Sequence, residues 1–480
     1  MLIRATKYLT NTMSKHLYYL IFSLTFTLFL SCEKEEFNTS ANAYLTFSQD
    51  TILFDTVFTS IGSSTQRFTV KNPYNKNLKI NSVYLAGGEN SPYRINIDGF
   101  PGTRLENIEL REKDSLYVFV EVTIDPLNED LPMVVKDSMV FQFNGKQQDI
   151  DLISYGQDIN LINGEIIGTE IWNSPKPYLI YNSMLVDTNS TLTLEAGTQL
   201  FFHKGSRLYV AGTIVANGTF ELPIIFQGDR LENDYEDIPG QWDGIWLMAG
   251  SQDNVFNFTE IKNAIIGIQV DTLANTTNPT LLLSNSRIEN MTSAGIYAQG
   301  STIEAYNNVI ANCGQYAVAL TIGGSYEFYH CTIGNYWGYS TRTTPSVILN
   351  NYYFDINNNL QRRPIDKALF GNCIIYGNKE SEVVIDKYED VDLHYKFDYT
   401  LMKVDKDFST SDPTNFENVI VNYDPKFIDP YNADYELDTL SIAKDKGKKE
   451  YGAMFPYDLN HENRTLDLAP DLGAFERLEK

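Results

Sequence analysis

The sequence predicts an all-β fold in which a β-sandwich is followed by a parallel β-helix, a solenoid of short strands. Between residues 42 and 157, short runs of alternating apolar and polar residues are separated by turn dipeptides, which indicates strands with one buried face. Between residues 255 and 376, isoleucines recur at steps of 27, 22, 23 and 42 residues, the last of which contains an insertion, and the shorter steps match one three-stranded coil. Tyr (31) and Phe (27), which favour strands, are abundant.

Length, charge and cysteine content narrow the possibilities. A chain of 480 residues is too long for one ordinary domain, so we expect two or three units. The net charge of −25 would repel a nucleic acid, and we therefore expect no nucleic-acid partner. The four cysteines form no CxxC or Cys/His cluster with metal spacing, so the sequence predicts no zinc site.

The N-terminus is typical of a signal peptide over residues 1–31. Its core is the uncharged apolar run LYYLIFSLTFTLFLS at 17–31, which follows a basic region and is short for a membrane span. The run ends at Ser31-Cys32, which resembles the lipobox of bacterial lipoproteins, although Phe29 stands where Leu is usual. This resemblance implies lipidation of Cys32 and membrane contact through that anchor only.

An acidic tether is expected over residues 32–41. It begins with Glu33, Lys34, Glu35 and Glu36. Acidic residues directly after a lipidated cysteine resemble the export signal that carries lipoproteins of the Bacteroidota to the outer face of the outer membrane. We therefore expect an outer-membrane lipoprotein that faces the cell exterior. The alternative is a merely solvated tether.

The first folded unit is expected over residues 42–157. A strand of period 2 covers 116–124, and similar runs occupy 65–72, 78–85 and 139–143. Strands at this spacing favour an immunoglobulin-like sandwich. The pattern FTVKNP…LKINSVYLAGG…DSLYVFVEV…DSMVFQFNG resembles the immunoglobulin-like modules that precede repeat domains in Bacteroidota surface proteins. We find no catalytic constellation in it and interpret it as a spacer.

The repeat is anchored on isoleucines at equivalent positions. These anchors are Ile261, Ile288, Ile310, Ile333 and Ile375. Asn recurs three residues before and two residues after them. Stacked coils place equivalent residues about 4.8 Å apart, so the anchors should form a buried ladder. Asn tolerates the left-handed backbone of a turn, so the Asn columns should mark the coil corners.

Both ends of the repeat region resemble known proteins. TLTLEAGTQLFFHKGSRLYVAGTIVANGTFELPIIFQG, followed by PGQWDGIWL, closely resembles the opening coils of right-handed, pectin-lyase-like β-helix proteins. NYDPKFIDPYNADYELD…APDLGAFE (422–476) resembles the segment that closes many secreted ones. The resemblance implies a right-handed parallel β-helix at 160–410 and a closing segment at 411–480. It implies little about activity, because this fold hosts lyases, hydrolases, adhesins and inert spikes.

Whether the protein is an enzyme stays open. A hydrolase of this fold would show clustered Asp pairs with His-Gly and an Arg-x-Lys, and we find neither. An elimination lyase needs a base and a group that neutralises the uronate. Side chains of suitable chemistry are Arg287, His330, Arg342, Arg362 and Arg363, none of them in a recognisable motif. His330 also fits the Asn column as a turn residue.

Two further features have both a binding and a structural interpretation. The acidic segment Asp229–Asp243 could bind Ca²⁺ or be a solvated loop; no other cofactor or metal is expected. Cys331 and Cys373 each stand two residues before an anchor. They could lie on neighbouring coils within disulfide reach, or be two buried thiols.

The insertion 336–368 is the most individual segment, because it breaks the coil spacing. Its candidate ligand-binding residues are Tyr336, Trp337, Tyr339, Arg342, Tyr352, Tyr353, Arg362 and Arg363. Aromatic faces suit sugar rings and arginines pair with uronate or sulfate groups, so these residue types predict glycan binding. The alternative is that the aromatics pack on the flank of the helix.

A recurring tripeptide, Asp followed by Ser or Thr and an apolar residue, resembles the O-glycosylation acceptor of Bacteroidota surface proteins. The acceptors would be Thr51, Thr56, Ser115, Ser138, Thr272 and Thr439. Taken together, the sequence favours a surface lipoprotein that binds glycans or another macromolecule without catalysis. The alternative is a polysaccharide lyase or glycoside hydrolase acting on an acidic polysaccharide. The two differ in whether acidic and basic side chains converge on one groove of the helix.

Overall fold

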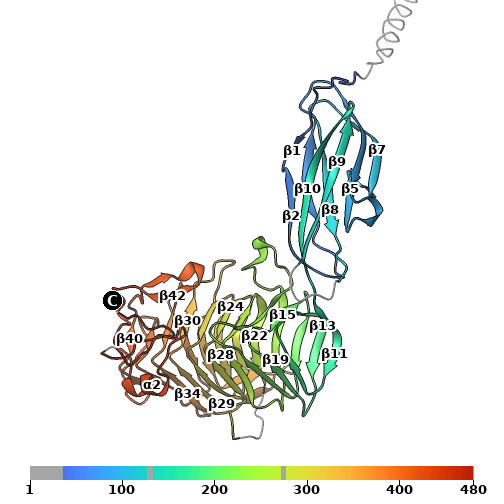
Figure 1. The fold of residues 1–480 in the computed structure, drawn as a ribbon. Helices are drawn as coiled ribbons and strands as arrows, with labels where there is room; N and C mark the ends of the chain where they lie inside the picture. The colour runs from blue at the N-terminus through green and yellow to red at the C-terminus, as the bar shows by residue number, and fades with distance from the viewer. Residues whose placement is uncertain (1–35, 127–132, 272–276, 467, 479–480) are drawn as a thin grey trace, which may run out of the picture. The chain divides into compact units, whose positions relative to one another are not determined.

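The computed structural model describes residues 36–126, 133–271, 277–466 and 468–478. Contacts divide the chain into two compact units; among the described residues, the first contains 36–125 and 134–155, and the second contains Pro126, Met133 and the residues from Gly156 onward. Figure 1 shows that strands build both, which confirms the predicted all-β class. The described residues contain one short α-helix, α2 (Lys449–Met454). No helix among them has the length and apolar character needed to cross a membrane.

The first unit consists of two five-stranded sheets. One has the order β1 (Thr46–Phe47), β3 (Gln66–Lys71), β8 (Ser115–Val122), β5 (Tyr93–Ile97), β6 (Phe100–Gly102). The other has the order β2 (Thr51–Phe58), β10 (Lys146–Gln157), β9 (Met133–Phe143), β4 (Leu78–Leu85), β7 (Arg104–Leu110). All four predicted strand runs are present, as β3, β4, β8 and β9. The immunoglobulin-like assignment of this unit stays a prediction.

Alternating side chains of these strands form the core of the sandwich. Leu116 and Val118 of β8 are buried, whereas Tyr117 between them is exposed. The sheets meet through aromatic pairs, with ring centroids 5.8 Å apart for Phe54 and Tyr93. Burial of the apolar face of each sheet stabilises the unit by about 25 cal/mol per Å² removed from water.

The second unit is a parallel β-helix with three strand faces. Each strand pairs in parallel with its equivalent in the next coil. The first face contains β13 (Tyr178–Val186), β15 (Gln199–Phe202), β18 (Ile224–Gly228), β21 (Thr259–Lys262), β24 (Arg287–Met291), β27 (Val309–Cys313), β30 (Thr332–Asn335), β35 (Ile374–Gly377), β38 (Leu401–Met402) and β40 (Ile420–Val421).

Two further columns complete the coils. The second face contains β11 (Asn160–Ile167), the end of β13, β16 (Arg207–Val210), β19 (Trp242–Leu247), β22 (Ala264–Val270), β25 (Ala294–Gln299), β28 (Tyr316–Thr321), β31 (Val347–Asn350) and β36 (Val383–Asp386). The third contains β12 (Glu170–Trp172), β14 (Thr191–Leu194), β17 (Thr213–Asn217), β20 (Asn254–Asn257), β23 (Leu281–Ser284), β26 (Thr302–Tyr306), β29 (Gly324–Tyr329), β34 (Ile365–Gly371), β37 (Lys396–Asp398) and β39 (Phe416–Glu417).

The predicted ladders are confirmed. The five anchor isoleucines pair in register from coil to coil and are buried. At the corner three residues before the anchor, the backbone is left-handed, with φ of 49° at Asn285, 55° at Asn307, 48° at His330 and 52° at Asn372. Side chains bond along this column, as from Asn307 Nδ2 to Asn285 Oδ1 at 3.1 Å.

The insertion is shorter than predicted. Residues 347–350 are not an excursion, because they form β31, which pairs with β28 and β36 as an ordinary coil strand. The chain leaves the coil on either side of it, first in residues 336–346 and then in the antiparallel hairpin β32 (Tyr352–Phe354) and β33 (Leu360–Arg362). It returns to the third face at β34. One coil with a long turn at 336–346 and a hairpin therefore accounts for the long step between Ile333 and Ile375.

The C-terminal segment folds back over the first face. The coils continue to β40, beyond the predicted boundary at residue 411. The hairpin β41 (Phe427–Asp429) and β42 (Asp434–Leu437) and later residues then pack on the outer side of the late coils. Tyr435, Leu472 and Phe475 share a buried cluster with Val309 and Leu401. This segment covers the late coils of the first face.

Candidate functional site

Most of the predicted export signal lies outside the described residues. Cys32, Glu33, Lys34 and Glu35 belong to that part, so lipidation and export stay predictions. Glu36 is exposed, and its Oε2 lies 2.8 Å from Lys76 Nζ. The hydrogen bond and the charge of Lys76 lower the pKa of Glu36.

The first part of the insertion is largely packed against the protein. Trp337 is only 6% exposed, and its Nε1 donates to Ser340 Oγ at 2.9 Å. Tyr336 packs against aromatic rings of the C-terminal segment, and burial raises its pKa. Tyr339 is half-exposed and donates its hydroxyl to the backbone oxygen of Asp237 at 2.6 Å. For Trp337 and Tyr336, the packing alternative describes the observed positions.

Arg342 points into the protein rather than toward solvent. Its Nη2 lies 2.7 Å from Glu382 Oε1 and its Nη1 lies 2.8 Å from Oε2, a bidentate pair with side chains 1% and 0% exposed. Arg342 also donates to the backbone oxygens of Thr344 and Asn335. The guanidinium is thus committed to internal partners, and the exposed surface of the insertion does not include it.

The second part of the insertion is the β32–β33 hairpin, which is largely exposed. Tyr352 pairs with Arg362 and Phe354 pairs with Leu360. Directly opposite residues of an antiparallel pair share one face, so these four side chains lie together. We call this surface the hairpin face. Tyr353, paired with Gln361, lies on the opposite side.

The hairpin face combines aromatic rings with a cation at the surface. Phe354 is 57% exposed. Tyr352 packs on Tyr388 with ring centroids 5.5 Å apart, and the Arg362 guanidinium lies 5.5 Å from the Tyr388 ring. Arg362 Nη1 also lies 3.5 Å from the exposed carboxylate of Asp390, a weak surface contact. The other predicted arginine, Arg363, is exposed as well.

A second group of charges, missed by the sequence analysis, lies on the outer side of the first face. Glu260 pairs in register with Arg287, and Lys262 with Glu289. We call these four residues the charged cluster. Arg287 Nη1 lies 3.4 Å from Glu289 Oε1. Burial raises the pKa of Glu289, and the charge of Glu260 raises it further against the opposing effect of Arg287.

The repeat itself contained the signal for the charged cluster. Each member stands one residue before or after an anchor isoleucine, Ile261 or Ile288. Such positions point outward because strand side chains alternate. In later coils the same positions hold residues such as Val309 and Ala311, which the C-terminal segment covers. The repeat pattern alone could therefore have identified the charged residues at outward positions of the earlier coils as candidate site residues.

The acidic segment Asp229–Asp243 makes internal contacts. Asp229 Oδ2 lies 2.7 Å from His203 Nδ1, and burial raises the pKa of Asp229. Arg230 Nη2 lies 2.9 Å from Glu232 Oε1. Across the described ranges, no group of three or more His, Cys, Asp or Glu side chains is arranged to hold a metal ion. Binding of Ca²⁺ by this segment stays a prediction.

His330, Cys331 and Cys373 belong to the helix interior. His330 is buried, its Nε2 lies 3.0 Å from Asn372 Nδ2, and burial lowers its pKa well below the ordinary value. It occupies the Asn column as a neutral turn residue. Cys331 and Cys373 are buried free thiols. They lie on neighbouring coils, because the backbone N–H of Ile374, next to Cys373, donates to the backbone oxygen of Cys331.

The proposed O-glycosylation acceptors fall in both units. Thr51, Thr56, Ser115 and Ser138 lie on strands of the first unit, and Ser115 is exposed at the start of β8. Thr439 is exposed in the C-terminal segment, and Thr272 lies outside the described residues. Their modification stays a prediction.

Comparison with known proteins bears on the second unit. Residues 159–333 match the family model described as a right handed beta helix region. The second unit is a right-handed β-helix. This match supports the predicted handedness and fold. It names no activity, and no curated protein matches the sequence.

Similarity to solved structures is weak. A family 123 glycoside hydrolase from Clostridium perfringens shares 10% identity over 26% of each chain, with a TM-score of 0.18. The E. coli chaperone DraB shares 12% identity over 25% of this chain and 58% of its own, also with a TM-score of 0.18. A protein of unknown function from Porphyromonas gingivalis W83 shares 12% identity over 26% of this chain and 60% of its own, at 0.17. The matches span less than two thirds of each of these chains and carry no functional argument.

Proposed function

We propose that this protein is a lipid-anchored cell-surface protein that binds an anionic glycan on the hairpin face without acting on it chemically. The observation that supports this proposal is the exposure of Phe354 beside Tyr352 and Arg362, where the chain leaves the coil. Loops on a rigid scaffold are where binding residues concentrate. The β-helix supplies that scaffold.

The aromatic rings fit the chemistry of a sugar. The C–H faces of a pyranose ring are apolar and stack on aromatic side chains. Phe354 exposes more than half of its surface, and its ring lies 6.3 Å from that of Tyr352 at a near-perpendicular angle. A sugar on the Phe354 ring would therefore also meet the edge of a second aromatic ring.

The arginine favours a negatively charged sugar. Its guanidinium can form two parallel hydrogen bonds with a carboxylate or sulfate. Arg362 contacts the exposed carboxylate of Asp390 and the ring of Tyr388. A uronate or sulfate could replace the Asp390 carboxylate at little cost. Because the chain carries a net charge of −25, an anion is repelled by most of the surface and should bind preferentially beside an exposed cation such as Arg362.

Substitutions on the two sides of the hairpin test the proposal. Phe354→Ala and Arg362→Ala should each weaken binding of the purified protein to polygalacturonate or chondroitin sulfate by about tenfold. Tyr353→Ala is the matched control, because Tyr353 is a half-exposed aromatic on the opposite side. Equal losses in all three variants, or binding to neither polysaccharide, would contradict the proposal. Uncharged dextran should bind less tightly than either.

The anchoring part of the proposal has a separate test. Lipidation at Cys32 predicts that a palmitate analogue labels the protein in cells. Cys32→Ser should abolish both labelling and membrane retention. Digestion of the protein by external protease on intact cells would support the outward location, and protection there would indicate the periplasmic side.

A second candidate function, polysaccharide cleavage, is favoured by the charged cluster. A carboxyl group whose pKa is raised by burial can act as a general acid, and Glu289 stands beside the carboxylate of Glu260. Release of reducing or unsaturated ends from a polysaccharide panel would support this function. Glu289→Gln should then abolish release while leaving binding at the hairpin face intact.

A further inference from the structure

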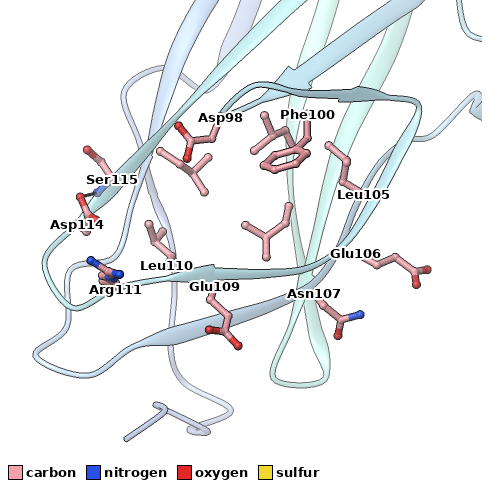
Figure 2. A pocket seen from close by; sticks show the side chains of 13 residues that line it. Asp98, Phe100, Leu105, Glu106, Asn107, Glu109, Leu110, Arg111, Asp114 and Ser115 are labelled. Carbon is pink, nitrogen blue, oxygen red and sulfur yellow. Dashed lines mark hydrogen bonds between the residues drawn. The ribbon is translucent and has the colours of Figure 1, made fainter. Parts of the chain in front are cut away.

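An open groove lies between the edges of the two sheets of the first unit. β6 ends one sheet and β7 ends the other, and a single residue joins them in the chain. The groove has a volume of about 620 Å³ and lies in front of buried apolar side chains of Ile97, Leu110 and Leu116. Figure 2 shows Phe100 and Leu105 beside this space. Phe100 is 68% exposed, so the sandwich core is incompletely closed here.

An irregularity in β7 accompanies the apolar lining. Asn107 has a φ of 57°, and β7 keeps one register with β4 on both sides of it, with Glu106 opposite Ser82 and Ile108 opposite Ile80. Simple alternation would place Leu105 and Ile108 on opposite sides of the strand. In this structure both line the groove, together with Leu110. In Figure 2, Glu106, Asn107 and Glu109 point away from it.

The rim of the groove is acidic. Asp98, Glu106, Glu109 and Asp114 line it, against the single cation Arg111. Glu106 is matched by Arg104, whose Nε lies 3.0 Å from its Oε1. No partner within the described residues holds the carboxylates of Asp98 or Glu109. The rim therefore keeps an excess of negative charge.

We infer that this groove docks an extended segment of a partner protein, in which basic residues alternate with apolar ones, as an added strand on β7. In the described residues β7 pairs with β4 alone, so its other side can pair with a new strand. Side chains of an added strand alternate as those of β7 do. Those beside Ile108 and Leu110 fill the apolar groove, and those beside Glu109 face solvent and its carboxylate.

The charge of the rim disfavours a second copy of this chain as the occupant. Pairing β7 with β7 of another molecule would bring two acidic rims together, on chains that each carry −25. Like charges directly opposite one another across strands are destabilising. A basic segment removes this repulsion and adds an attraction.

Three probe peptides test the inference with the purified full chain. The first alternates Val and Lys over nine residues, the second replaces Lys by Glu, and the third has the first peptide's composition with Val and Lys in separate blocks. By fluorescence anisotropy the alternating basic peptide should bind at least about tenfold more tightly than the other two. Hydrogen exchange should slow at the backbone amides of β7 in the complex.

Surface substitutions identify the site. Phe100→Ala and the rim reversal Glu109→Lys should each weaken binding of the basic peptide about fivefold or more. Tyr117→Ala is the matched control, because this exposed aromatic of β8 lies outside the groove lining, and binding should change less than about twofold. Equal binding of the acidic peptide, unchanged exchange at β7, or concentration-dependent dimers lost in Glu109→Lys would overturn the inference.

Discussion

Removing the cation of the Arg342–Glu382 pair is the sharpest test of the β-helix interior. Glu382 accepts from both Arg342 Nη atoms and from Ser346 N, Ser346 Oγ and Lys379 N, at 2.6 to 3.0 Å. Arg342→Met replaces a buried cation by an apolar side chain of similar length. The Glu382 carboxylate then stays buried without a counter-ion. Loss of one partner of such a pair costs about 3–5 kcal/mol of unfolding free energy.

Tryptophan fluorescence in urea can measure this loss for the second unit alone. All 4 tryptophans of the chain, Trp172, Trp242, Trp246 and Trp337, lie in that unit. The unfolding midpoint should fall in Arg342→Met and in Glu382→Met. The double variant should recover part of the loss, because two apolar side chains leave no unpaired charge. An unchanged midpoint in Arg342→Met, together with weaker glycan binding, would refute the structural role of this arginine.

Three further outcomes follow from the described contacts. Ile310→Asp places an unpaired charge in the anchor ladder and should cost several kcal/mol, seen as loss of strand signal in circular dichroism. Burial raises the pKa of Glu476 from 4.5 to about 8, so the folded state binds its proton more tightly than the unfolded chain. Stability should therefore fall as pH rises from about 5 to 8, and Glu476→Gln should flatten this thermal-melting profile. Cys331 and Cys373 should react with a thiol reagent only after unfolding; thiols that never react in denaturant would indicate a disulfide.

The sequence predicted the β-helix well because its evidence is local and repeated. Each coil places an apolar anchor and a turn residue at nearly the same spacing, and stacking requires the equivalent residues to meet. The pairing of Ile288 with Ile310 and the left-handed backbone at Asn307 both follow from that requirement. Even His330, an exception in residue type, adopts the turn conformation of its column.

The candidate sites were less accessible to sequence reasoning. Arg342 and Tyr336 are residue types expected of a binding loop, yet Arg342 is buried against Glu382 and Tyr336 packs on a C-terminal segment that folds back from far along the chain. The two sides of the hairpin depend on which residues pair across it, which the sequence does not state. The charged cluster was hidden for the same reason, because the C-terminal segment covers the equivalent outward positions only in the later coils.

Stability and binding should separate cleanly in the second unit, because different residues serve them. The buried ladders and the Arg342–Glu382 pair hold the coils together, whereas the hairpin face lies where the chain has left the coil. More than half of the Phe354 side chain is exposed, so its truncation should change the free energy of unfolding by less than about 0.5 kcal/mol. Trp337 is a similar aromatic in the same insertion, but it is buried, and its truncation should cost about 3–5 kcal/mol. If Trp337→Ala instead weakened glycan binding at unchanged stability, the recognition surface would have to include the packed turn as well as the hairpin.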